Sequence, residues 1–327
     1  MSSESAAMNM DNSATQSSAN VASDWQSKVW RDSLLSGFEL GNRYQMLPNF
    51  DGNRGLNGTM FRQRAGSSLE FLEHRDYQPG DDLRHIDWSV MAKRDQVYVK
   101  CFEQESTPVL DLVLDHSQSM NLVDSEKATG TLKLVGAVTT AARAAHFHVK
   151  IWLAGSSLVD HAVAETSGGC HLFQTPNPHP ASWPIPDFSG IQNLSDAFQE
   201  RLPSFRPQGF RILISDLLFD ADPMPIIQQF SQQSQSCLII QVLAEADITP
   251  PSHGSVRIID SESNETQTVF IDTDMQKRYT EAFNRHQSRW IEAASRQGCR
   301  FVPMIAENLI HQNHLKELEE MQILVPS

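Results

Sequence analysis

The chain has 327 residues, of which 40% are hydrophobic and 20% charged. This composition is typical of a globular protein with one large core or two smaller ones. Its 40 acidic and 26 basic residues give a formal net charge of −14, which disfavours a general nucleic-acid or anionic-membrane surface, because phosphate binding needs clustered lysine and arginine. The four cysteines are widely spaced and suggest neither a zinc site nor a redox pair.

Residues 1–24 are predicted to form a disordered tail. They are rich in Ser, Ala and Asn and lack apolar periodicity, so they cannot bury enough surface to offset the entropy of ordering. They also lack the cationic start and apolar block of a signal peptide. No run of about 18 apolar residues occurs anywhere, and a transmembrane helix needs one. We therefore expect a cytoplasmic protein with no transmembrane segment and no nucleic-acid partner.

Residues 25–106 are expected to form an N-terminal helix followed by a small β-rich module. Apolar side chains recur at three- and four-residue spacing between residues 25 and about 46, which is the pattern of an amphipathic helix. Residues 96–103 alternate between apolar and polar side chains, which predicts a half-buried strand.

The polar block at residues 70–88 of this module permits two interpretations. In the first, opposite charges around a Pro79-Gly80 turn form a compact ion-pair network that fixes a loop, with Trp88 in the core. In the second, the block is a docking surface for a partner protein, because Arg, Tyr and Trp side chains supply much of the binding energy at interfaces. The partner-binding candidates are Arg75, Tyr77, Arg84 and Trp88.

From residue 107 to residue 327, strand-like and helix-like patterns alternate. This order predicts an α/β domain with a doubly wound, mostly parallel sheet and helices on both faces. A hairpin formed by residues 256–259 and 268–271 is expected at one edge of the sheet. Helices are expected over residues 131–147 and 273–297. The predicted strands are Val109–Leu114, Lys150–Leu153, Phe210–Ser215, Cys237–Leu243 and Arg300–Ile305.

The first of these strands ends in Asp115, and Ser117 and Ser119 follow at alternate positions. One carboxylate and two hydroxyls on a short turn are the oxygen ligands that a hard divalent cation prefers, and Mg²⁺ keeps several waters, so coordination positions stay open. In open sheets of this kind, ligands bind beyond the carboxyl ends of the strands. We expect Mg²⁺ at this turn, with Mn²⁺ or Ca²⁺ as alternatives.

Two other segments are candidates for the same site. Asp216 terminates the strand Phe210–Ser215 just as Asp115 terminates its own, so the two carboxylates meet if their strands are neighbours. The turn at residues 189–198 can bring an oxygen of Gln192 or Asn193 to the site, although Asn193 or Ser195 is equally suited to cap the following helix.

These residues carry a family resemblance that runs from about residue 35 to the C-terminus. Asp115-x-Ser117-x-Ser119 with Asp216 is similar to the metal-ion-dependent adhesion site of von Willebrand factor A domains. The segment from Gly66 to Trp88, which includes Glu70 and Arg75, resembles the signature of the bacterial family called domain of unknown function 58. The resemblance implies a von Willebrand A-like domain that binds proteins, in association with a MoxR-type AAA+ ATPase, in chaperone-like maturation or stress response. Gln192 stands where that fold carries a threonine ligand.

Catalysis is not expected. A phosphate-transferring enzyme of the haloacid dehalogenase type needs a second aspartate where Ser117 stands, and the sequence contains no Gly-x-Ser-x-Gly elbow, Walker A loop or Gly-x-Gly-x-x-Gly fingerprint. The function that we expect is divalent-cation-assisted protein binding. The first alternative is a metal-free interaction scaffold that uses the surface from Arg75 to Trp88. A metal-dependent hydrolase is the less favoured alternative.

Overall fold

A computed structural model of the chain describes residues 25–47, 71–78, 81, 83–94, 97–102, 107–122, 125–155, 169–173, 179–190, 192–249, 254–259 and 266–327. The chain forms two compact units. The larger unit is built from residues 1–51 and 108–327, and the smaller unit from residues 52–107. The predicted disordered tail and the Pro79-Gly80 turn lie outside the described residues.

A six-stranded sheet is the centre of the larger unit, with the strand order β11-β8-β7-β4-β5-β6. Five of the strands run parallel, and only β6 at one edge runs antiparallel to its neighbour. This order is that of a doubly wound α/β fold, and the predicted fold class is confirmed. The strands are β4 (Val109–Asp115), β5 (His148–Ala154), β6 (Cys170–Phe173), β7 (Phe210–Ser215), β8 (Ser236–Leu243) and β11 (Arg300–Ile305).

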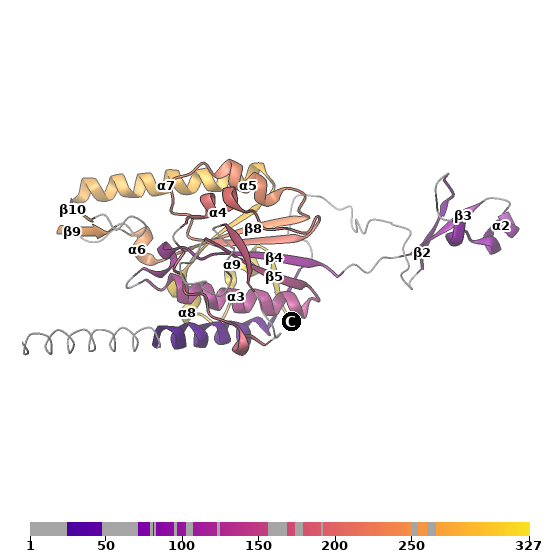
Figure 1. Ribbon diagram of the computed structural model, residues 1–327, viewed down its shortest axis with the longest axis horizontal. Helices are drawn as coiled ribbons and strands as arrows, with labels where there is room; N and C mark the ends of the chain where they lie inside the picture. The colour runs from indigo at the N-terminus through magenta and orange to yellow at the C-terminus, as the bar shows by residue number, and fades with distance from the viewer. Residues whose placement is uncertain are drawn as a thin grey trace, which may run out of the picture. The chain divides into compact units, whose positions relative to one another are not determined.

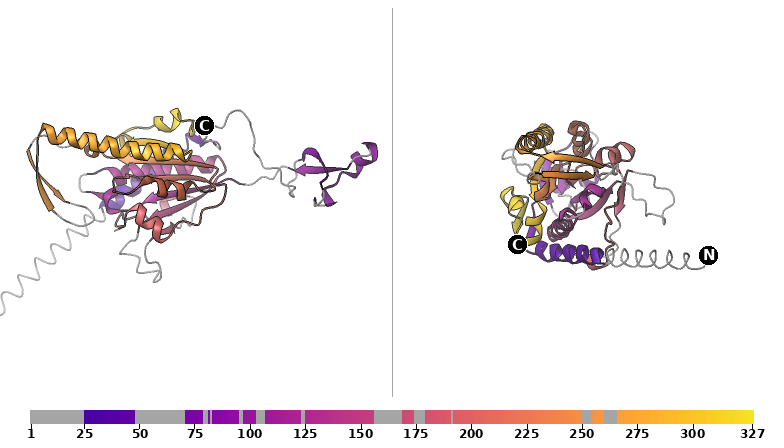
Figure 2. Two further views of the ribbon diagram at one scale, coloured as in Figure 1. Left: turned by 90° about the horizontal axis from the view of Figure 1, so that it is seen from above. Right: turned by 90° about the vertical axis from the view of Figure 1, so that its left-hand side faces the viewer.

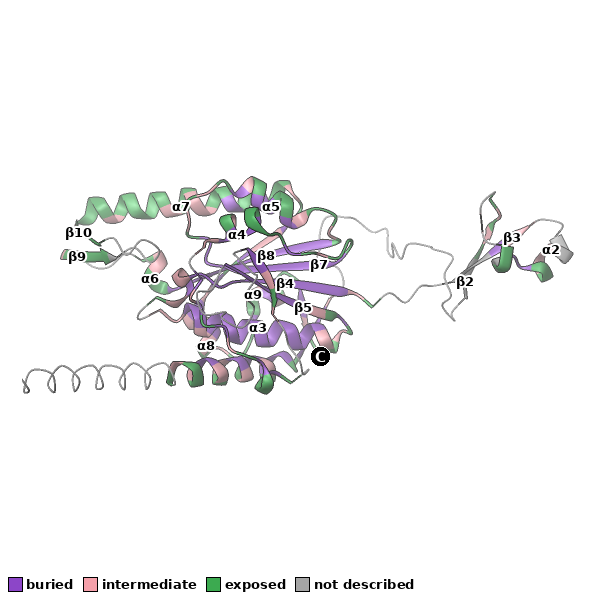
Figure 3. Ribbon diagram, viewed as in Figure 1, coloured by how far each residue is buried: buried purple, intermediate pink, exposed green. Residues whose placement is uncertain are grey.

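The central strands are nearly continuous apolar runs because both of their faces are covered. Every residue of β4, β7 and β8 is buried, as expected for a parallel sheet between two layers of helices. Figure 3 shows this buried centre, with α3 itself largely buried on one side of the sheet and α7 mostly exposed on the other. Helices α3 (Lys127–Ala144), α8 (Ala306–His311) and α9 (Lys316–Glu320) lie on one side, and α4 (Leu194–Glu200), α5 (Pro223–Ser231) and α7 (Thr273–Arg296) on the other (Figures 1 and 2).

The N-terminal helix, residues 25–41, packs against α3 in the larger unit (Figure 1). A Cβ atom added to Gly37 would lie 1.9 Å from the carbonyl oxygen of Lys133, so only glycine permits this approach. Trp30 and Leu34 are buried in the same core as α3. Beyond the helix, β1 (Tyr44–Met46) pairs with the C-terminal strand β12 (Leu324–Pro326).

The N-terminal segment therefore belongs with the α/β unit, whereas the sequence grouped it with the small module over residues 25–106. Its apolar stripe needed a surface to cover, and that surface is α3. The smaller unit is consequently an insertion between β1 and β4. Its described elements are β2 (Phe71–Asp76), η1 (Leu83–His85), α2 (Trp88–Arg94) and β3 (Tyr98–Phe102), of which β2 and β3 pair antiparallel.

The predicted hairpin exists, but its predicted place at an edge of the main sheet is wrong. Strands β9 (Gly254–Ile259) and β10 (Thr266–Ile271) form a separate two-stranded sheet that leads directly into α7 (Figure 2). The edge strand β11 contains Pro303, which has no N–H to donate to a further strand and so blunts pairing at that edge. Strand β6 was not predicted from the sequence, because it has only four residues.

The close approach of the N-terminal helix to α3 can be tested by replacing Gly37 with leucine. Because the added side chain would meet the backbone of Lys133, Gly37→Leu is expected to lower the free energy of unfolding by about 3 kcal/mol or more through overpacking. Thermal unfolding measured by circular dichroism would show this as a clear fall in Tm.

The matched control is Ser36→Leu, because Ser36 is the exposed neighbour on the same helix. An exposed substitution of this kind changes stability by about 0.5 kcal/mol or less. If the two variants melted at the same temperature as the unmodified chain, the helix would not pack against α3 as described.

Candidate functional site

The candidate site lies at the edge of the sheet where β4 and β7 end. The two strands pair directly, as the sequence argument required, so Asp115 at the end of β4 and Asp216 just after β7 come from neighbouring strands. Both side chains are buried, each about 1% exposed. Their proximity is reflected in the pKa of Asp115, which Asp216 helps to raise. Two carboxylates thus meet at one rim, as predicted.

Asp115 is held in place by hydrogen bonds to both of its carboxylate oxygens. The backbone N–H of Ser117 donates to Oδ1 at 3.0 Å, and the hydroxyl of Ser215 donates to Oδ2 at 2.5 Å. Burial, with the negative charge of Asp216 as the second cause, raises the pKa of Asp115 to about 6, while the hydrogen bonds oppose the shift. A positive charge placed next to Asp115 would therefore stabilise its ionised form.

The two serine hydroxyls beyond β4 face each other. The Oγ atoms of Ser117 and Ser119 are 3.0 Å apart. Two adjacent oxygen ligands of an octahedral Mg²⁺ ion, at about 2.0–2.1 Å from the metal, are themselves separated by about 2.9 Å. The spacing of this hydroxyl pair therefore fits neighbouring positions in the coordination shell of a small divalent cation.

The segment at residues 187–190 supports this turn from the side. Ser117 and Gly190 form a parallel bridge, and the backbone of Gly190 exchanges hydrogen bonds with His116 and Gln118. A Cβ atom on Gly190 would lie 2.7 Å from the carbonyl oxygen of His116, so this contact requires glycine. The imidazole of His116 is buried and pairs with Asp187 at 2.7 Å, which, together with Ser189, lowers the pKa of Asp187 to about 2.

Asp216 is occupied by a cation that belongs to the protein. The ammonium group of Lys127, the first residue of α3, donates to Oδ2 of Asp216 at 2.9 Å and lies 3.4 Å from Oδ2 of Asp247 in α6 (Glu245–Ile248). The Lys127 side chain is 1% exposed. Burial acts to lower the pKa of Lys127, but Asp216 and Asp247 outweigh it, so the net shift is upward.

Gln192 does not join this group as the sequence predicted. Its Oε1 accepts a hydrogen bond from the backbone N–H of Gly169 at 3.1 Å, and its Nε2 donates to Glu200 at 2.6 Å. The amide is therefore used to hold β6 and α4, because it is long enough to reach both. Asn193 takes the alternative role considered for it and caps α4 by accepting from the N–H of Asp196. We remove Gln192 from the ligand set.

The candidate partner-binding residues lie in the smaller unit, and they differ in whether they are tied into an ion pair or exposed. Arg75 pairs with Asp81 at 2.7 Å, and this ion pair fits the interpretation of a loop-fixing network. Trp88 opens α2 and is 62% exposed, so its predicted place in the core is wrong. Arg84 is exposed as well, and Tyr77 is partly buried.

A charge network next to Trp88 explains why that end of α2 is ordered. Asp87 accepts hydrogen bonds from the N–H groups of Ser89 and Val90 and from the Ser89 hydroxyl, and it pairs with His74 at 2.9 Å. The Ser89 hydroxyl and then His74 hold the pKa of Asp87 well below its usual range. Asp87 thus acts as the N-cap of α2, which leaves Trp88 standing on a fixed helix end.

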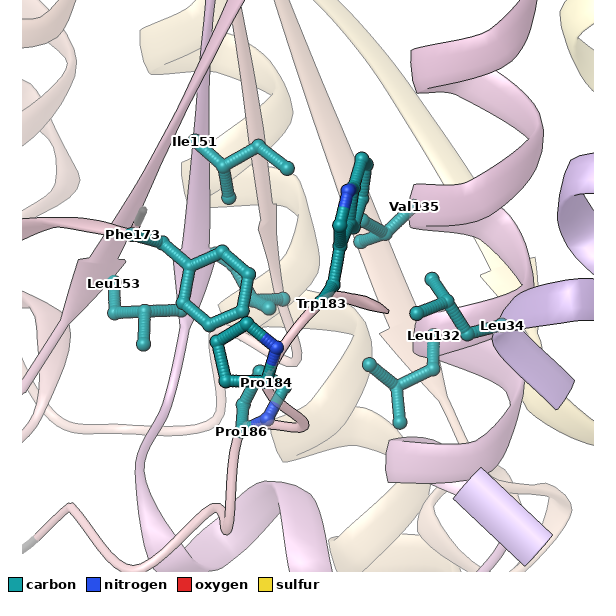
Figure 4. A pocket seen from close by; sticks show the side chains of 10 residues that line it. Leu34, Leu132, Val135, Ile151, Leu153, Phe173, Trp183, Pro184 and Pro186 are labelled. Atoms are coloured by element: carbon teal, nitrogen blue, oxygen red, sulfur yellow. The ribbon is translucent and has the colours of Figure 1, made fainter. Parts of the chain in front are cut away.

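The larger unit also contains a small apolar crevice, shown in Figure 4. Phe173, Trp183 and two prolines lie on one side of it, and Leu34 of the N-terminal helix and Leu132 of α3 lie on the other. All of its lining side chains are apolar apart from the indole nitrogen of Trp183. A ligand site normally adds a few polar groups that fix orientation, so we assign no binding function to this crevice.

Two residues of the site were not predicted from the sequence: Lys127 and Asp247. The signal for Asp247 was available, because it follows β8, the strand beside β7, and the rule on carboxyl ends of parallel strands applies there too. Lys127 had no such signal, because the helix was expected to begin at residue 131. Within the described residues, no cluster of three or more His, Cys, Asp or Glu side chains could hold a metal, so any cation site there depends on hydroxyl ligands.

Comparisons with known proteins identify a family. The sequence profile described as "Protein of unknown function DUF58" matches residues 73–289, about two thirds of the chain. Uncharacterized proteins of Mycobacterium bovis and Mycobacterium tuberculosis are each 25% identical over 235 residues, which cover 71% of this chain and 73% of each relative.

Two solved structures show distant likeness. The conserved hypothetical protein BatB from Bacteroides thetaiotaomicron matches 65% of this chain and 98% of its own with a TM-score of 0.36 and 11% identity. An aerotolerance-related membrane protein from Bacteroides fragilis, with multiple mutations to serines, matches 65% of this chain and 99% of its own with a TM-score of 0.33 and 12% identity. Among the described helices of the present chain, none is long and apolar enough to cross a membrane.

The raised pKa of Asp115 predicts that this carboxylate costs stability above about pH 6. A carboxyl whose pKa is raised by folding binds its proton more tightly in the folded state, so stability is greatest at low pH and falls as the pH rises through about 4 to 6. The neutral isostere Asp115→Asn should therefore melt above the unmodified chain at pH 8, by about 1 kcal/mol or more in unfolding free energy, as measured by thermal unfolding in chelator.

The difference between the two proteins should shrink as the pH falls below about 6, because Asp115 is then protonated and resembles asparagine in charge. Asp196→Asn is the control at an exposed carboxylate and should show no comparable gain at pH 8. A stability advantage of Asp115→Asn that stayed constant from pH 5 to pH 8 would contradict the burial of a charged Asp115.

Proposed function

We propose that this chain, which belongs to the DUF58 family of proteins of unknown function, is a protein-binding domain. In this proposal the rim of the sheet at Asp115 recognises an acidic side chain of a partner, with a divalent cation as the intermediary. The observation that carries the proposal is the pair of serine hydroxyls, 3.0 Å apart, beside a buried carboxylate of raised pKa.

The residues that would hold the cation are the hydroxyls of Ser117 and Ser119, with Asp115 as the neighbouring negative charge. The bound cation would supply a positive centre with open positions, which a carboxylate of another protein can enter. The chain's own contribution is to fix the two hydroxyls, which the bridge between Ser117 and Gly190 and the hydrogen bond from Ser117 to Asp115 achieve.

The charge balance at the rim supports cation binding. Asp115, Asp216 and Asp247 are three carboxylates, and Lys127 is the single buried cation found among them in the described part of the chain. A buried carboxylate is costly unless it is paired. Lys127 satisfies Asp216, whereas Asp115 receives only neutral donors. A divalent cation beside Ser117 and Ser119 would supply the charge that Asp115 lacks.

Mg²⁺ is the cation that the spacing of the hydroxyls fits best, with Mn²⁺ next because it accepts similar oxygen ligands. Ca²⁺ takes longer bonds and more ligands, and the loss of Gln192 from the ligand set makes it a poorer match. We propose no catalytic role. Ser117 stands where a phosphate-transferring enzyme of the haloacid dehalogenase type carries the second aspartate that serves as acid or base.

The partner that the family resemblance implies is a MoxR-type AAA+ ATPase, and we propose one as the first protein to test. A solvent-exposed carboxylate on such a partner is the chemistry that the rim would recognise. The role in chaperone-like maturation or stress response follows from the same resemblance and rests on this proposal.

A second candidate function is supported by the smaller unit. Trp88 and Leu83 are each more than 60% exposed, and Trp88 stands next to the ordered network around Asp87. Exposed tryptophan on a fixed helix end is typical of an anchor at a protein interface. In this alternative the chain is a metal-free scaffold, and Lys127 is the only cation that the rim uses.

The two candidates can be separated by measuring the binding of a purified MoxR-type ATPase from the same genome to the immobilised full chain. With Mg²⁺ present, cation-assisted binding predicts that chelator weakens capture at least tenfold, because the partner carboxylate loses the positive centre it enters. Ser119→Ala should weaken capture to a similar degree. Ser204→Ala, at an exposed serine away from the site, is the matched control and should bind like the unmodified chain.

The opposite pattern would support the scaffold. Capture that is the same in Mg²⁺ and in chelator, is unchanged by Ser119→Ala and is lost in Trp88→Ala would overturn the cation-assisted proposal. Circular dichroism of each variant would establish that the loss reflects binding and not unfolding.

A further inference from the structure

A row of polar side chains crosses the sheet at the end opposite the candidate site. The strand register places Asp111 of β4 beside Arg211 of β7, and Arg211 beside Cys237 of β8. Leu238 pairs with Arg300 of β11, so Cys299, one residue earlier, continues the row next to Cys237. Four consecutive strands thus bring together a carboxylate, a guanidinium and two thiols that are far apart in the sequence.

The row is buried in an apolar layer. Asp111, Arg211, Cys237 and Cys299 are between 0% and 7% exposed, and the two cysteines belong to the core cluster that packs under α5 and α7. Neither cysteine is in a disulfide. Most of the layer around them consists of side chains such as Phe230 and Trp290, so a polar row here is not explained by exposure to water.

The guanidinium of Arg211 lies within electrostatic reach of both sulfur atoms. Burial lowers the pKa of Arg211, whereas Cys237, Asp111 and Cys299 all act in the opposite direction. Arg211 stacks on the ring of Phe205 at 4.3 Å and donates to the carbonyl oxygen of Phe230. Its Nε is buried with no hydrogen-bond partner among the described residues. The register thus places a buried guanidinium with an unused N–H donor in the same layer as the two sulfur atoms.

We propose that Cys237 and Cys299 are a reversible redox pair that forms a disulfide across β8 and β11 when the protein meets a hydroperoxide. Neighbouring strands lie about 4.7–4.9 Å apart, which is within the Cα separation of about 4.4–6.8 Å that a disulfide bridges. Because residues in lateral register on parallel strands point to the same face, both thiols face the same layer.

The reaction balances without any other component. The thiolate of Cys237 attacks one oxygen of hydrogen peroxide, the O–O bond breaks, and Cys237 becomes a sulfenic acid while hydroxide leaves and takes up the thiol proton as water. The thiol of Cys299 then attacks the Cys237 sulfur, and a second water leaves as the S–S bond forms. Two thiols and one hydrogen peroxide yield one disulfide and two waters, so two electrons pass from sulfur to the peroxide.

Cys237 is assigned the first step because it has a hydroxyl beside it. The Oγ of Ser234 lies 2.9 Å from Sγ of Cys237 and can donate to the thiolate. Cys299 is the more accessible partner at 7% exposure, and it directly follows the turn at Gly298 that ends α7. A disulfide would join β8 to the end of α7, so oxidation would restrain the long helix that carries the β9–β10 hairpin.

The experiment uses the full reduced chain, treated with a small excess of hydrogen peroxide, alkylated in denaturant and digested with trypsin without reductant. Mass spectrometry should find the tryptic peptide of residues 212–257 joined to that of residues 297–300, with loss of two thiols per chain and recovery of both by dithiothreitol. Cys170 should stay reduced in the same sample, because its register on β6 places Ala154 of β5 beside it and not a second cysteine.

Two comparisons make the result specific. Cys299→Ser should abolish the linked peptide and leave Cys237 as a sulfenic acid that a dimedone probe traps, whereas Cys170→Ser should form the linked peptide as the unmodified chain does. A chain unfolded in urea should lose the selectivity for this pair. The proposal is overturned if native protein gives no linked peptide, if Cys170 is oxidised at the same rate as Cys237, or if the pair forms only in urea. The wild-type peptide map decides the matter even if a serine variant fails to fold.

Discussion

The buried ammonium of Lys127 is the interaction on which the rim of the sheet depends. Three strands of a parallel sheet deliver carboxylates to one edge, and the low-polarity surroundings make each negative charge costly. Lys127 reaches Asp216 and Asp247 from the first turn of α3. Without it, the buried carboxylate of Asp216 and the partly buried carboxylate of Asp247 would lose the cation that pairs with both.

The same interaction shapes what the rim can do. Because Lys127 already pairs with Asp216, a second cation would gain most beside Asp115, which is held by neutral donors from Ser117 and Ser215. The two serine hydroxyls stand on that side. At the rim, Asp216 is therefore paired with a buried cation, whereas the negative charge of Asp115 is not balanced by one among the described residues. This difference between the two carboxylates is the physical basis of the proposed function.

The sequence predicted the features that depend on local pattern and on the general rules of parallel sheets. The predicted bounds of Phe210–Ser215 and Arg300–Ile305 match β7 and β11 to the residue, and Asp115 and Asp216 were placed at one rim because the carboxyl ends of neighbouring strands meet. What failed depended on contacts between distant segments. The N-terminal helix was assigned to the wrong unit because an amphipathic pattern does not identify the surface that the helix packs against. That surface is α3, where Gly37 approaches the backbone of Lys133.

The sequence also did not predict where long side chains point or which groups they contact. Gln192 stands at the predicted turn, but its amide reaches Gly169 and Glu200, which no spacing rule anticipates. Cys237 and Cys299 are 62 positions apart in the chain, so their spacing does not predict a pair, whereas the strand register places them side by side. Trp88 was placed in the core only in the interpretation of a loop-fixing network, and it is exposed at the start of α2, where Asp87 caps the helix.

The most direct test of the central claim is the anomalous diffraction of crystals grown with Mn²⁺, compared with crystals grown in chelator. The account predicts one strong anomalous peak about 2.2 Å from the hydroxyl oxygens of both Ser117 and Ser119, with Lys127 still paired to Asp216. An absence of any peak at saturating Mn²⁺, or a peak located away from these two hydroxyls, would contradict it.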